Sequence, residues 1–325
     1  MKALLCKTLG PPEALTIETV DGPTAGPGEV VIRVSAVGLN FFDTLIIAGK
    51  YQYRPELPFS PGAEASGKVV QVGAGVTRLS VGERVMALTG WGALREEVAV
   101  KAEKCVALPD EVGDEAAAVL QVTYGTAYHA LKERGSLTAR ETLVVLGAAG
   151  GTGQAAVEIG RTLGAIVVAV ASSDDKCAFC QALGAHATIN STKEDVKARI
   201  REVTDGRGAD VIFDPVGGDL TEQAFRSIAW GGRHLVVGFA AGEIPRLPLN
   251  LPLLKGASAV GVFWGHHAER EPERHRADME QLLELLRQGR VRPHIDHRYR
   301  LEEANLALRS LAERRVKGKA VIVLA

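Results

Sequence analysis

The sequence has little cysteine, few aromatic residues and almost no net charge. Its 325 residues include only four cysteines, whose spacing does not form a disulfide framework and suits a reducing compartment. A formal net charge of −1 gives no basic footprint for nucleic acid or an anionic membrane. No apolar run reaches the roughly 18 residues of a membrane-spanning helix, and the start MKALLCKTLGPPEAL lacks the apolar core of a signal peptide. We expect a cytoplasmic protein with no nucleic-acid or membrane partner.

Two short motifs are weak candidates for metal or redox chemistry. Cys177 and Cys180 form a C-x-x-C, but a zinc ribbon needs a second pair, and the surrounding KCAFCQALGA is typical of a helix with small residues facing inward. A redox pair stays open, and a structural role is favoured. The pair His266-His267 has no carboxylate or cysteine at ligand spacing, so we interpret it as surface or cleft polarity and predict no metal.

The pattern of apolar runs changes near residue 124. Residues 1–124 contain short strand-like runs separated by Gly, Pro and Asp clusters, which is typical of an antiparallel β-rich domain. Continuous apolar runs then alternate with helical stretches at 151–164, 175–184, 193–203 and 219–229, which predicts a parallel sheet covered on both faces. We therefore predict an α/β protein with one domain at 1–124 plus 266–325 and an inserted domain at 125–265.

The stretch LVVLGAAGGTGQAAVEIG, residues 143–160, reads as a strand, a glycine-rich corner and a helix. It fits the dinucleotide fingerprint G-x-G-x-x-G in part, with Ala148 at the first glycine position and Gly150 and Gly153 at the others. A glycine at 150 admits a pyrophosphate close to the backbone, and a glycine at 153 lets the helix pack on the sheet. We predict that the corner, with Gly151 and Thr152, binds the phosphates at a helix N-terminus.

The tip of the next strand decides which dinucleotide the protein prefers. NAD binders commonly carry an acid there, whereas this strand ends in Ala171-Ser172-Ser173, with Lys176 following. Two hydroxyls and an ammonium suit the 2′-phosphate of NADPH. Asp174 or Asp175 could instead turn inward, or the segment could simply cap the next helix. We favour NADPH.

These motifs together resemble a known family, the zinc-independent quinone oxidoreductase (zeta-crystallin-like) branch of the medium-chain dehydrogenases/reductases. The resemblance rests on PGEVVIRVSAVGLNFFD, PFSPGAEASGKVVQVGAGV, GAAGGTG, GRGADVIFDPVGGD and GKAVIVL, and it spans essentially the whole chain. It implies a GroES-like β-rich catalytic domain, completed by the C-terminal segment, and a Rossmann doubly wound parallel-sheet domain, with the active site in a cleft between them.

The resemblance also shows which metal ligands are missing. Zinc alcohol dehydrogenases of this superfamily hold a catalytic ion with a Cys, a His-Glu pair and a further Cys or Asp. The first position is Asn40 here and the His position is Ala63, and the four-Cys lobe is absent. Without a strong Lewis acid, an acceptor that spreads charge over its own π-system is favoured. We expect hydride transfer from NADPH to a quinone or another conjugated carbonyl.

By resemblance, individual positions acquire candidate roles. Asn40 lies at the nicotinamide end of the cleft, where its amide donates to cofactor or substrate, and Tyr51 is a candidate proton donor, with solvent as the alternative. Asp43 and Glu64, the acids of the old metal site, are interpreted as structural acceptors. Trp264 is a candidate for the substrate mouth, although it and Phe263 fit dimer or hinge packing equally. Further candidates for cofactor contact are Asn190, Val216, Phe239, Phe263, Lys319 and Thr126, the last of which is expected to begin a helix.

Three further expectations complete the prediction. The segment AVGVFWG, 259–265, is the sixth strand of the Rossmann sheet by resemblance and lies at its edge. Pairing of this apolar edge with a second subunit predicts a homodimer. The alternatives to quinone reduction are an enoyl-thioester (enoyl-CoA or acyl-carrier) reductase, and a non-catalytic NADPH-binding protein that turns over no acceptor.

Overall fold

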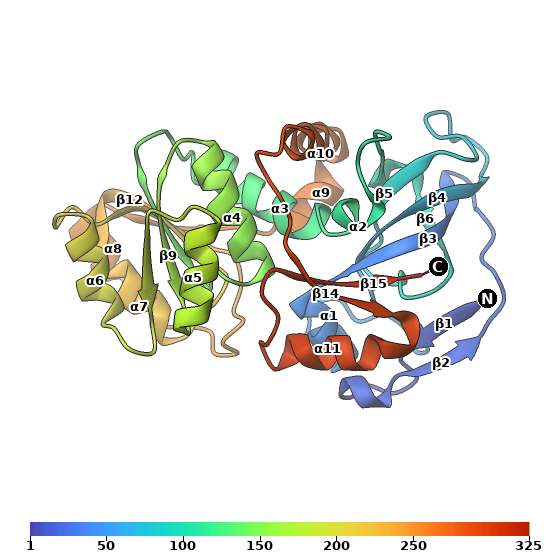
Figure 1. Cartoon of the computed structure of the whole chain (residues 1–325), viewed down its shortest axis with the longest axis horizontal. Coiled ribbons are helices and arrows are strands. Elements are labelled where there is room, and N and C mark those ends of the chain that lie inside the picture. Colours follow the sequence, from blue (N-terminus) through green and yellow to red (C-terminus); the bar gives the residue numbers. More distant parts are fainter. Residues whose placement is uncertain (325) are drawn as a thin grey trace. The chain divides into compact units, whose positions relative to one another are not determined.

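The computed structural model describes residues 1–324, which divide into two compact units (Figure 1). The first unit comprises Met1–Val122, Glu271–Gly289 and the chain from Pro293 onward, and the second comprises Thr123–Arg270 with Arg290–Arg292. The second unit is thus inserted into the first, and each has its own sheet and core.

The predicted division and the two units differ at three short segments, 123–124, 266–270 and 290–292, all of which lie in the second unit. Residues 266–270 belong to the second unit because a helix there follows directly from its last strand. The 290–292 segment also joins the second unit. The Arg292 N–H donates to Glu158 Oε1 at 3.2 Å, and Gln154 Nε2 donates to the Arg292 carbonyl at 3.1 Å.

The first unit contains a seven-stranded sheet and a separate two-stranded sheet, β1-β2. The larger sheet has the order β14-β15-β3-β4-β5-β7, β6 also pairs with β3, and every pair is antiparallel except β14–β15. The strands are β1 (Lys2–Leu5), β2 (Thr16–Thr19), β3 (Glu29–Leu39), β4 (Glu64–Val72), β5 (Arg84–Leu88), β6 (Glu97–Lys101), β7 (Cys105–Ala107), β14 (Ile295–Arg300) and β15 (Lys319–Val323). The helices are η1 (Pro12–Ala14), α1 (Phe41–Ile47), η2 (Ala102–Lys104), α2 (Asp114–Ala117), α10 (Pro272–Arg287), η4 (Leu301–Glu303) and α11 (Ala304–Ala312).

Strand β3 is the centre of this unit. Its β-branched residues Val30, Ile32 and Val34 alternate along the strand, so they share one face, and all three are buried in the core of this unit. Gly38 permits a close approach near its end, since a Cβ there would lie 2.2 Å from the Ala118 carbonyl oxygen. The C-terminal strand β15 pairs with this same end of β3, so residues from opposite ends of the chain meet there.

The second unit contains a six-stranded parallel sheet with the order β10-β9-β8-β11-β12-β13. Numbered within the unit, this is the 3-2-1-4-5-6 order of the doubly wound dinucleotide fold, which confirms the predicted fold class. The strands are β8 (Thr142–Leu146), β9 (Ile166–Ala171), β10 (Ala187–Asn190), β11 (Ala209–Asp214), β12 (Ile228–Val236) and β13 (Ser258–Gly261). The helices are α3 (Gln121–Tyr128), which begins two residues before the unit, a π-helical segment η3 (His129–Arg134), α4 (Gly151–Thr162), α5 (Asp174–Ala182), α6 (Val196–Val203), α7 (Asp219–Phe225), α8 (Asn250–Lys255) and α9 (Trp264–Arg270).

Helices cover both faces of this sheet, α4 and α5 on one side and α6, α7 and α8 on the other (Figure 1). That arrangement follows from right-handed crossovers on either side of β8. The central strands are apolar on both faces, and all five residues of β8 are buried. This agrees with the continuous apolar runs in the sequence.

The last strand of the sheet is shorter than predicted. A strand was expected over 259–265, but β13 ends at Gly261 and α9 begins at Trp264. The chain turns away because the Trp264 ring lies over Gly125 of α3, where an added Cβ would be 2.7 Å from the indole Cζ2. The predicted helices at 193–203 and 219–229 are also shorter, because Asp195 caps α6 and β12 begins at Ile228.

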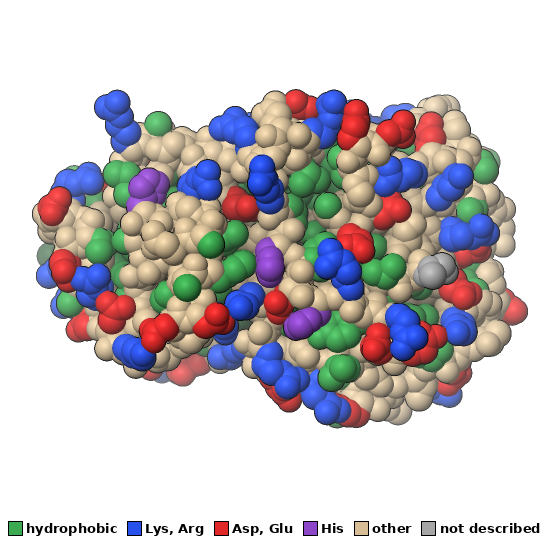
Figure 2. All heavy atoms as spheres, in the orientation of Figure 1, with side chains coloured by type: hydrophobic (Ala, Val, Ile, Leu, Met, Phe, Trp, Pro, Cys, Tyr) green, Lys and Arg blue, Asp and Glu red, His purple; other side chains and the backbone are tan. Residues whose placement is uncertain are grey.

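The surface carries charged side chains of both signs (Figure 2), and the four cysteines are buried. Lys and Arg side chains are interspersed with Asp and Glu on the face that Figure 2 shows. Among residues 1–324, no helix combines the length and the apolar character needed to cross a membrane. All four cysteines are buried thiols, and burial raises the pKa of Cys180 to about 12. A high thiol pKa disfavours the reactive thiolate, which supports the structural interpretation of the C-x-x-C.

Candidate functional site

The glycine-rich corner lies between β8 and α4, as predicted. Gly153 is fixed by packing, because an added Cβ would lie 2.2 Å from the Gly147 carbonyl oxygen. Gly150 is different: a Cβ there would meet only that oxygen, at an ordinary 3.5 Å, so its small size is not needed for packing. Gly147 was missed by the fingerprint, and its φ of +61° requires glycine.

Helix α4 begins without a cap. Its N-cap residue is Gly150, which has no side chain to accept a hydrogen bond from the first turn. The N–H groups of Gly151, Thr152 and Gly153 have no acceptor within the helix, because they lie in its first turn. Together with the helix dipole, these donors form an anion-binding end at the carboxyl edge of the sheet.

The tip of β9 presents the predicted hydroxyls and ammonium. Lys176 Nζ donates to Ser172 Oγ at 3.4 Å, and Ser173 caps α5 by accepting the Lys176 N–H at 3.3 Å. Ser173 therefore has the capping role considered as an alternative, while Ser172 and the Lys176 side chain lie together at the tip.

The acid beside this tip is already paired with another lysine. Asp174 accepts hydrogen bonds from Asn190 Nδ2 at 2.6 Å and from Lys193 Nζ at 2.5 Å, and these interactions lower its pKa. A carboxylate held in this way is partly neutralised. Lys193 was missed because it lies in a different loop, after β10, and only the parallel sheet brings the two strand ends together.

The loop after β11 is organised by a buried carboxylate that the sequence reasoning did not single out. Asp214 accepts the N–H groups of Val216 and Gly217 at 2.9 Å each and the Thr221 hydroxyl at 2.6 Å. His234 Nε2 lies 3.1 Å from the same carboxylate, and this contact opposes burial, so the pKa of Asp214 is lowered. Val216, a predicted cofactor contact, thus has a fixed backbone and lies against Gly147 of the corner.

The remaining predicted positions of the second unit differ in exposure. Phe239 and Phe263 are exposed, and the Phe263 ring stacks on His266 with centroids 5.7 Å apart. Trp264, the candidate for the substrate mouth, is only 6% exposed and packs on α3, which favours the packing alternative. Thr126 was expected to begin a helix, but it lies inside α3, so it is not an N-terminal cap.

A buried polar group lies at the junction of β3, β4 and β15 in the first unit. Lys319 Nζ donates to Asn40 Oδ1 at 2.7 Å and to Glu64 Oε1 at 3.0 Å, and each of these residues is 5% exposed or less. Asn40 Nδ2 donates to Glu64 Oε1 at 3.0 Å and to the Gly38 carbonyl at 3.3 Å. Both hydrogens of this amide are therefore used within the protein. Lys319, expected beside the cofactor, has its ammonium on Asn40 and Glu64.

Two acids complete the group, in agreement with the structural interpretation of both. Glu64 Oε2 accepts the Val122 N–H at 2.9 Å, and Asp43 accepts the Asn40 N–H at 2.7 Å as part of a capping box on α1. Burial raises the pKa of Asp43 to about 7, although the Lys319 ammonium acts in the opposite direction. Asp43 is thus readily protonated near neutral pH.

Tyr51 belongs to an aromatic cluster in the same unit. Its ring stacks on Phe42, with centroids 5.3 Å apart and planes 17° apart, and Tyr53 and Trp91 follow in a row. Burial raises the Tyr51 pKa to about 12, so the phenol keeps its proton at neutral pH. Tyr53 lies close to Tyr51 in the sequence, whereas Trp91 joins this cluster only through the fold.

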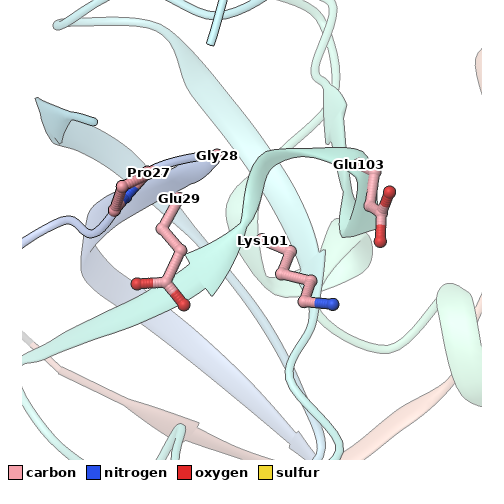
Figure 3. Close-up of a pocket in the computed structure, with 5 residues that line it drawn as sticks. All are labelled: Pro27, Gly28, Glu29, Lys101 and Glu103. Carbon is pink, nitrogen blue, oxygen red and sulfur yellow. The ribbon is translucent and has the colours of Figure 1, made fainter. Parts of the chain in front are cut away.

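One surface hollow lies away from all of these residues. It is lined by Pro27, Gly28, Glu29, Lys101 and Glu103, near the start of β3 and the end of β6 (Figure 3). It combines one lysine with two glutamates and contains none of the predicted site residues, so it has no part in the candidate site.

Comparisons with known proteins agree with this geometry. Residues 26–110 match the family model "Alcohol dehydrogenase GroES-like domain", and residues 151–288 match "Zinc-binding dehydrogenase". The chain is 40% identical over 324 residues to the quinone oxidoreductase-like protein 2 homolog of Nematostella vectensis, covering 99% of this chain and 88% of the relative. Escherichia coli quinone oxidoreductase complexed with NADPH has a TM-score of 0.94 at 26% identity, with 100% of both chains covered. The CurK enoyl reductase has a TM-score of 0.90 at 26% identity, covering 100% of this chain and 99% of that one. The chain therefore belongs to the quinone oxidoreductase branch of the medium-chain dehydrogenase/reductase family.

Proposed function

We propose that this protein reduces quinones or other conjugated carbonyl compounds with NADPH and without a catalytic metal ion. The observation that carries the proposal is the Lys319 ammonium, held 2.7 Å from Asn40 and 3.0 Å from Glu64. By family resemblance, Asn40 and Ala63 occupy zinc-ligand positions. An alanine offers no ligand atom, and a buried ammonium already neutralises the neighbouring acid. A catalytic zinc ion does not fit these residues.

The second unit fits NADPH. The free N–H groups at the start of α4 can donate to the pyrophosphate, and Gly150 lets the pyrophosphate come close to the backbone. Ser172 and Lys176 offer a hydroxyl and an ammonium for a 2′-phosphate, and Lys193 neutralises Asp174 beside them. The NADPH complex of the E. coli relative supports this choice. When bound, NADPH supplies a hydride.

Tyr51 is our candidate for the proton that must accompany the hydride. Its raised pKa keeps the phenol protonated, so it can donate to the reduced acceptor while solvent restores its proton. Asn40 uses both amide hydrogens within the protein, and we therefore assign it a positioning role toward Lys319 and Glu64. A conjugated acceptor spreads negative charge over its own π-system, which suits a site with hydrogen-bond donors and no Lewis acid.

The main alternative is an enoyl-thioester reductase. The likeness to the CurK enoyl reductase favours it, because an enoyl thioester is also a conjugated carbonyl. The two candidates share cofactor and proton donor and differ in the acceptor, so a direct assay separates them.

The first experiment measures NADPH oxidation by absorbance against 1,4-benzoquinone, 9,10-phenanthrenequinone, an α,β-unsaturated ketone and crotonyl-CoA, with NADH and EDTA controls. We expect turnover of the quinones or the enone, a preference for NADPH and no effect of EDTA. Turnover of crotonyl-CoA alone would select the enoyl reductase. NADPH binding with no turnover of any acceptor would contradict the enzyme and leave the non-catalytic protein.

A variant pair tests the proton donor. Tyr51→Phe removes the phenolic proton and keeps the ring stack on Phe42, so we expect kcat to fall by roughly 10²-fold with little change in KM. Tyr53→Phe is the matched control and should keep its activity. Unchanged kcat in Tyr51→Phe would assign the proton to solvent.

We also propose a cytoplasmic homodimer that pairs through β13. This strand is the edge of the six-stranded sheet, and exposed apolar side chains lie on α8 and on the turn before α9. They include Leu253, Leu254 and Phe263, which are 78%, 68% and 50% exposed. An uncovered apolar edge is a hazard that a second subunit removes. Light scattering after size exclusion should give twice the mass of one chain. Val260→Pro, a change within β13, should lower this measured mass.

A further inference from the structure

Three potential metal ligands meet in the second unit, away from the glycine corner in sequence. His129 and Glu133 lie four residues apart on η3, and His267 lies on α9. The ligand atoms of all three residues lie within 4.8 Å of one another. His129 Nδ1 is 2.5 Å from Glu133 Oε2, and His267 Nε2 is 3.8 Å from the same oxygen.

The surroundings make this more than a surface cluster. The three side chains are between 8% and 13% exposed, and the two imidazole rings stack with centroids 4.1 Å apart. The π-helical form of η3 is itself uncommon and is found frequently at functional sites. Arg134 of the same segment also donates to the Gly261 carbonyl at 3.1 Å, so η3 is already joined to the end of β13.

The donor set has a definite chemical preference. Two imidazoles and one carboxylate are the protein ligands of many zinc sites, with a fourth position left for water.

We propose that His129, Glu133 and His267 form a site for a divalent transition-metal ion, with Zn²⁺ as the best-fitting ion. The ion would replace the proton shared by His129 and Glu133. Ligand atoms on a tetrahedral zinc ion are roughly 3.3 Å apart, so this pair opens by less than about 1 Å and His267 turns inward. The bound ion would join α9 to η3 and thereby fix the chain that follows the edge strand β13.

This departs from the sequence prediction of no metal. In the sequence, His267 stands beside His266 and shows no ligand spacing to a carboxylate or cysteine. The fold gives it different partners, because α9 packs beside η3 and His266 instead stacks on Phe263. The proposed site consists only of second-unit residues, whereas the group of Asn40, Glu64 and Lys319 belongs to the first unit. It therefore does not depend on the proposed function.

The test uses the full-length chain, without an affinity tag and freed of metal by EDTA. Zn²⁺ binding is measured by competition with a chromophoric chelator, and Co²⁺ serves as a spectroscopic probe. We expect one ion per chain and the visible bands of tetrahedral Co²⁺. Glu133→Gln and His267→Gln should each weaken Zn²⁺ binding by at least about 10-fold. His266→Gln is the matched control, and its affinity should be unchanged.

Melting curves of the metal-free variants show that each is folded, and Glu133→Gln keeps the size of the side chain if a histidine variant is unstable. Zn²⁺ should raise the melting temperature of the wild type but not of Glu133→Gln. The proposal is overturned if the wild type binds no stoichiometric ion, or if His266→Gln weakens binding as much as His267→Gln.

Discussion

Lys319 and Asn40 are 279 positions apart in the chain, yet the Lys319 ammonium donates a 2.7 Å hydrogen bond to Asn40 Oδ1. The contact follows from strand register. Ala320 of β15 is opposite Leu39 of β3 in an antiparallel pair. Lys319, which precedes Ala320, therefore lies opposite Asn40, which follows Leu39. Glu64, which begins β4, completes the group at 3.0 Å. The C-terminal strand thus supplies the positive charge that stabilises the buried Glu64 carboxylate.

Removal of that charge should destabilise the protein strongly. Lys319→Met keeps the length of the side chain but leaves the Glu64 carboxylate, 1% exposed, without its cation. Breaking a buried pair in this way typically costs about 3–5 kcal/mol. We expect a loss of this size in urea unfolding. The double variant Lys319→Met/Glu64→Gln should recover part of it, and equal losses in the single and double variants would contradict the pairing.

The glycine corner should separate cofactor binding from folding. Gly153→Ala would bring a Cβ to 2.2 Å from the Gly147 oxygen, whereas a Cβ at Gly150 has ordinary contacts. We expect Gly153→Ala to lower the free energy of unfolding by about 1–3 kcal/mol. Gly150→Val should unfold nearly as the wild type does but bind NADPH at least about 10-fold more weakly, because its side chain stands where the pyrophosphate approaches. NADPH titration by fluorescence and urea unfolding measure the two effects, and normal NADPH affinity in Gly150→Val would contradict the assignment.

The sequence predicted the fold well because the fold depends on repeated local patterns. Continuous apolar runs and the glycine corner are visible in residues 142–171, and they specify parallel strands and a crossover helix. Partners brought together by register could not be seen in this way. Three such contacts join segments that are separate in the sequence, and only side-chain packing decides which polar groups meet. They are Lys193 with Asp174, His234 with Asp214, and His267 with His129 and Glu133.

The end of β13 illustrates the same limit. Residues 259–265 have an apolar strand pattern, but Trp264 needs space for an indole, and Gly125 of α3 provides it. Tertiary packing thus ends the strand at Gly261. A strand propensity alone could not reveal this, because the deciding glycine lies far earlier in the sequence.

Cofactor preference should follow the tip of β9. In Ser172→Asp/Lys176→Ala, a carboxylate replaces a hydroxyl and the nearby ammonium is lost, so a 2′-phosphate is repelled and a ribose 2′-OH gains an acceptor. We expect the ratio of kcat/KM for NADPH to that for NADH to fall by roughly 10²-fold. Lys101→Ala, an exposed lysine of the other unit, is the control. An unchanged ratio would indicate that Lys193 or another group reads the phosphate.

Asp43 should give the folded protein a stability that decreases as pH rises. Its carboxyl is fully buried, and burial raises the pKa from 3.8 to about 7. Between these two values the folded chain keeps a proton that the unfolded chain releases, so each pH step in that window favours unfolding. Below about pH 4 both states hold the proton, and above about pH 7 neither does, so the dependence is confined to that interval.

Asp43→Asn removes the titration while its amide oxygen can still accept the Asn40 N–H. Urea unfolding at pH 4.5 and pH 7.5, values chosen within and just above the window, should therefore show a smaller loss of stability in Asp43→Asn than in the wild type. Asp21→Asn, at an exposed position, should behave as the wild type does. Burial also raises the pKa of Glu158, so the stability of every variant still depends on pH to some extent. The informative quantity is therefore the difference between the wild type and Asp43→Asn. Parallel pH profiles for those two proteins would show that Asp43 is ionised in the fold, with the Lys319 ammonium outweighing burial.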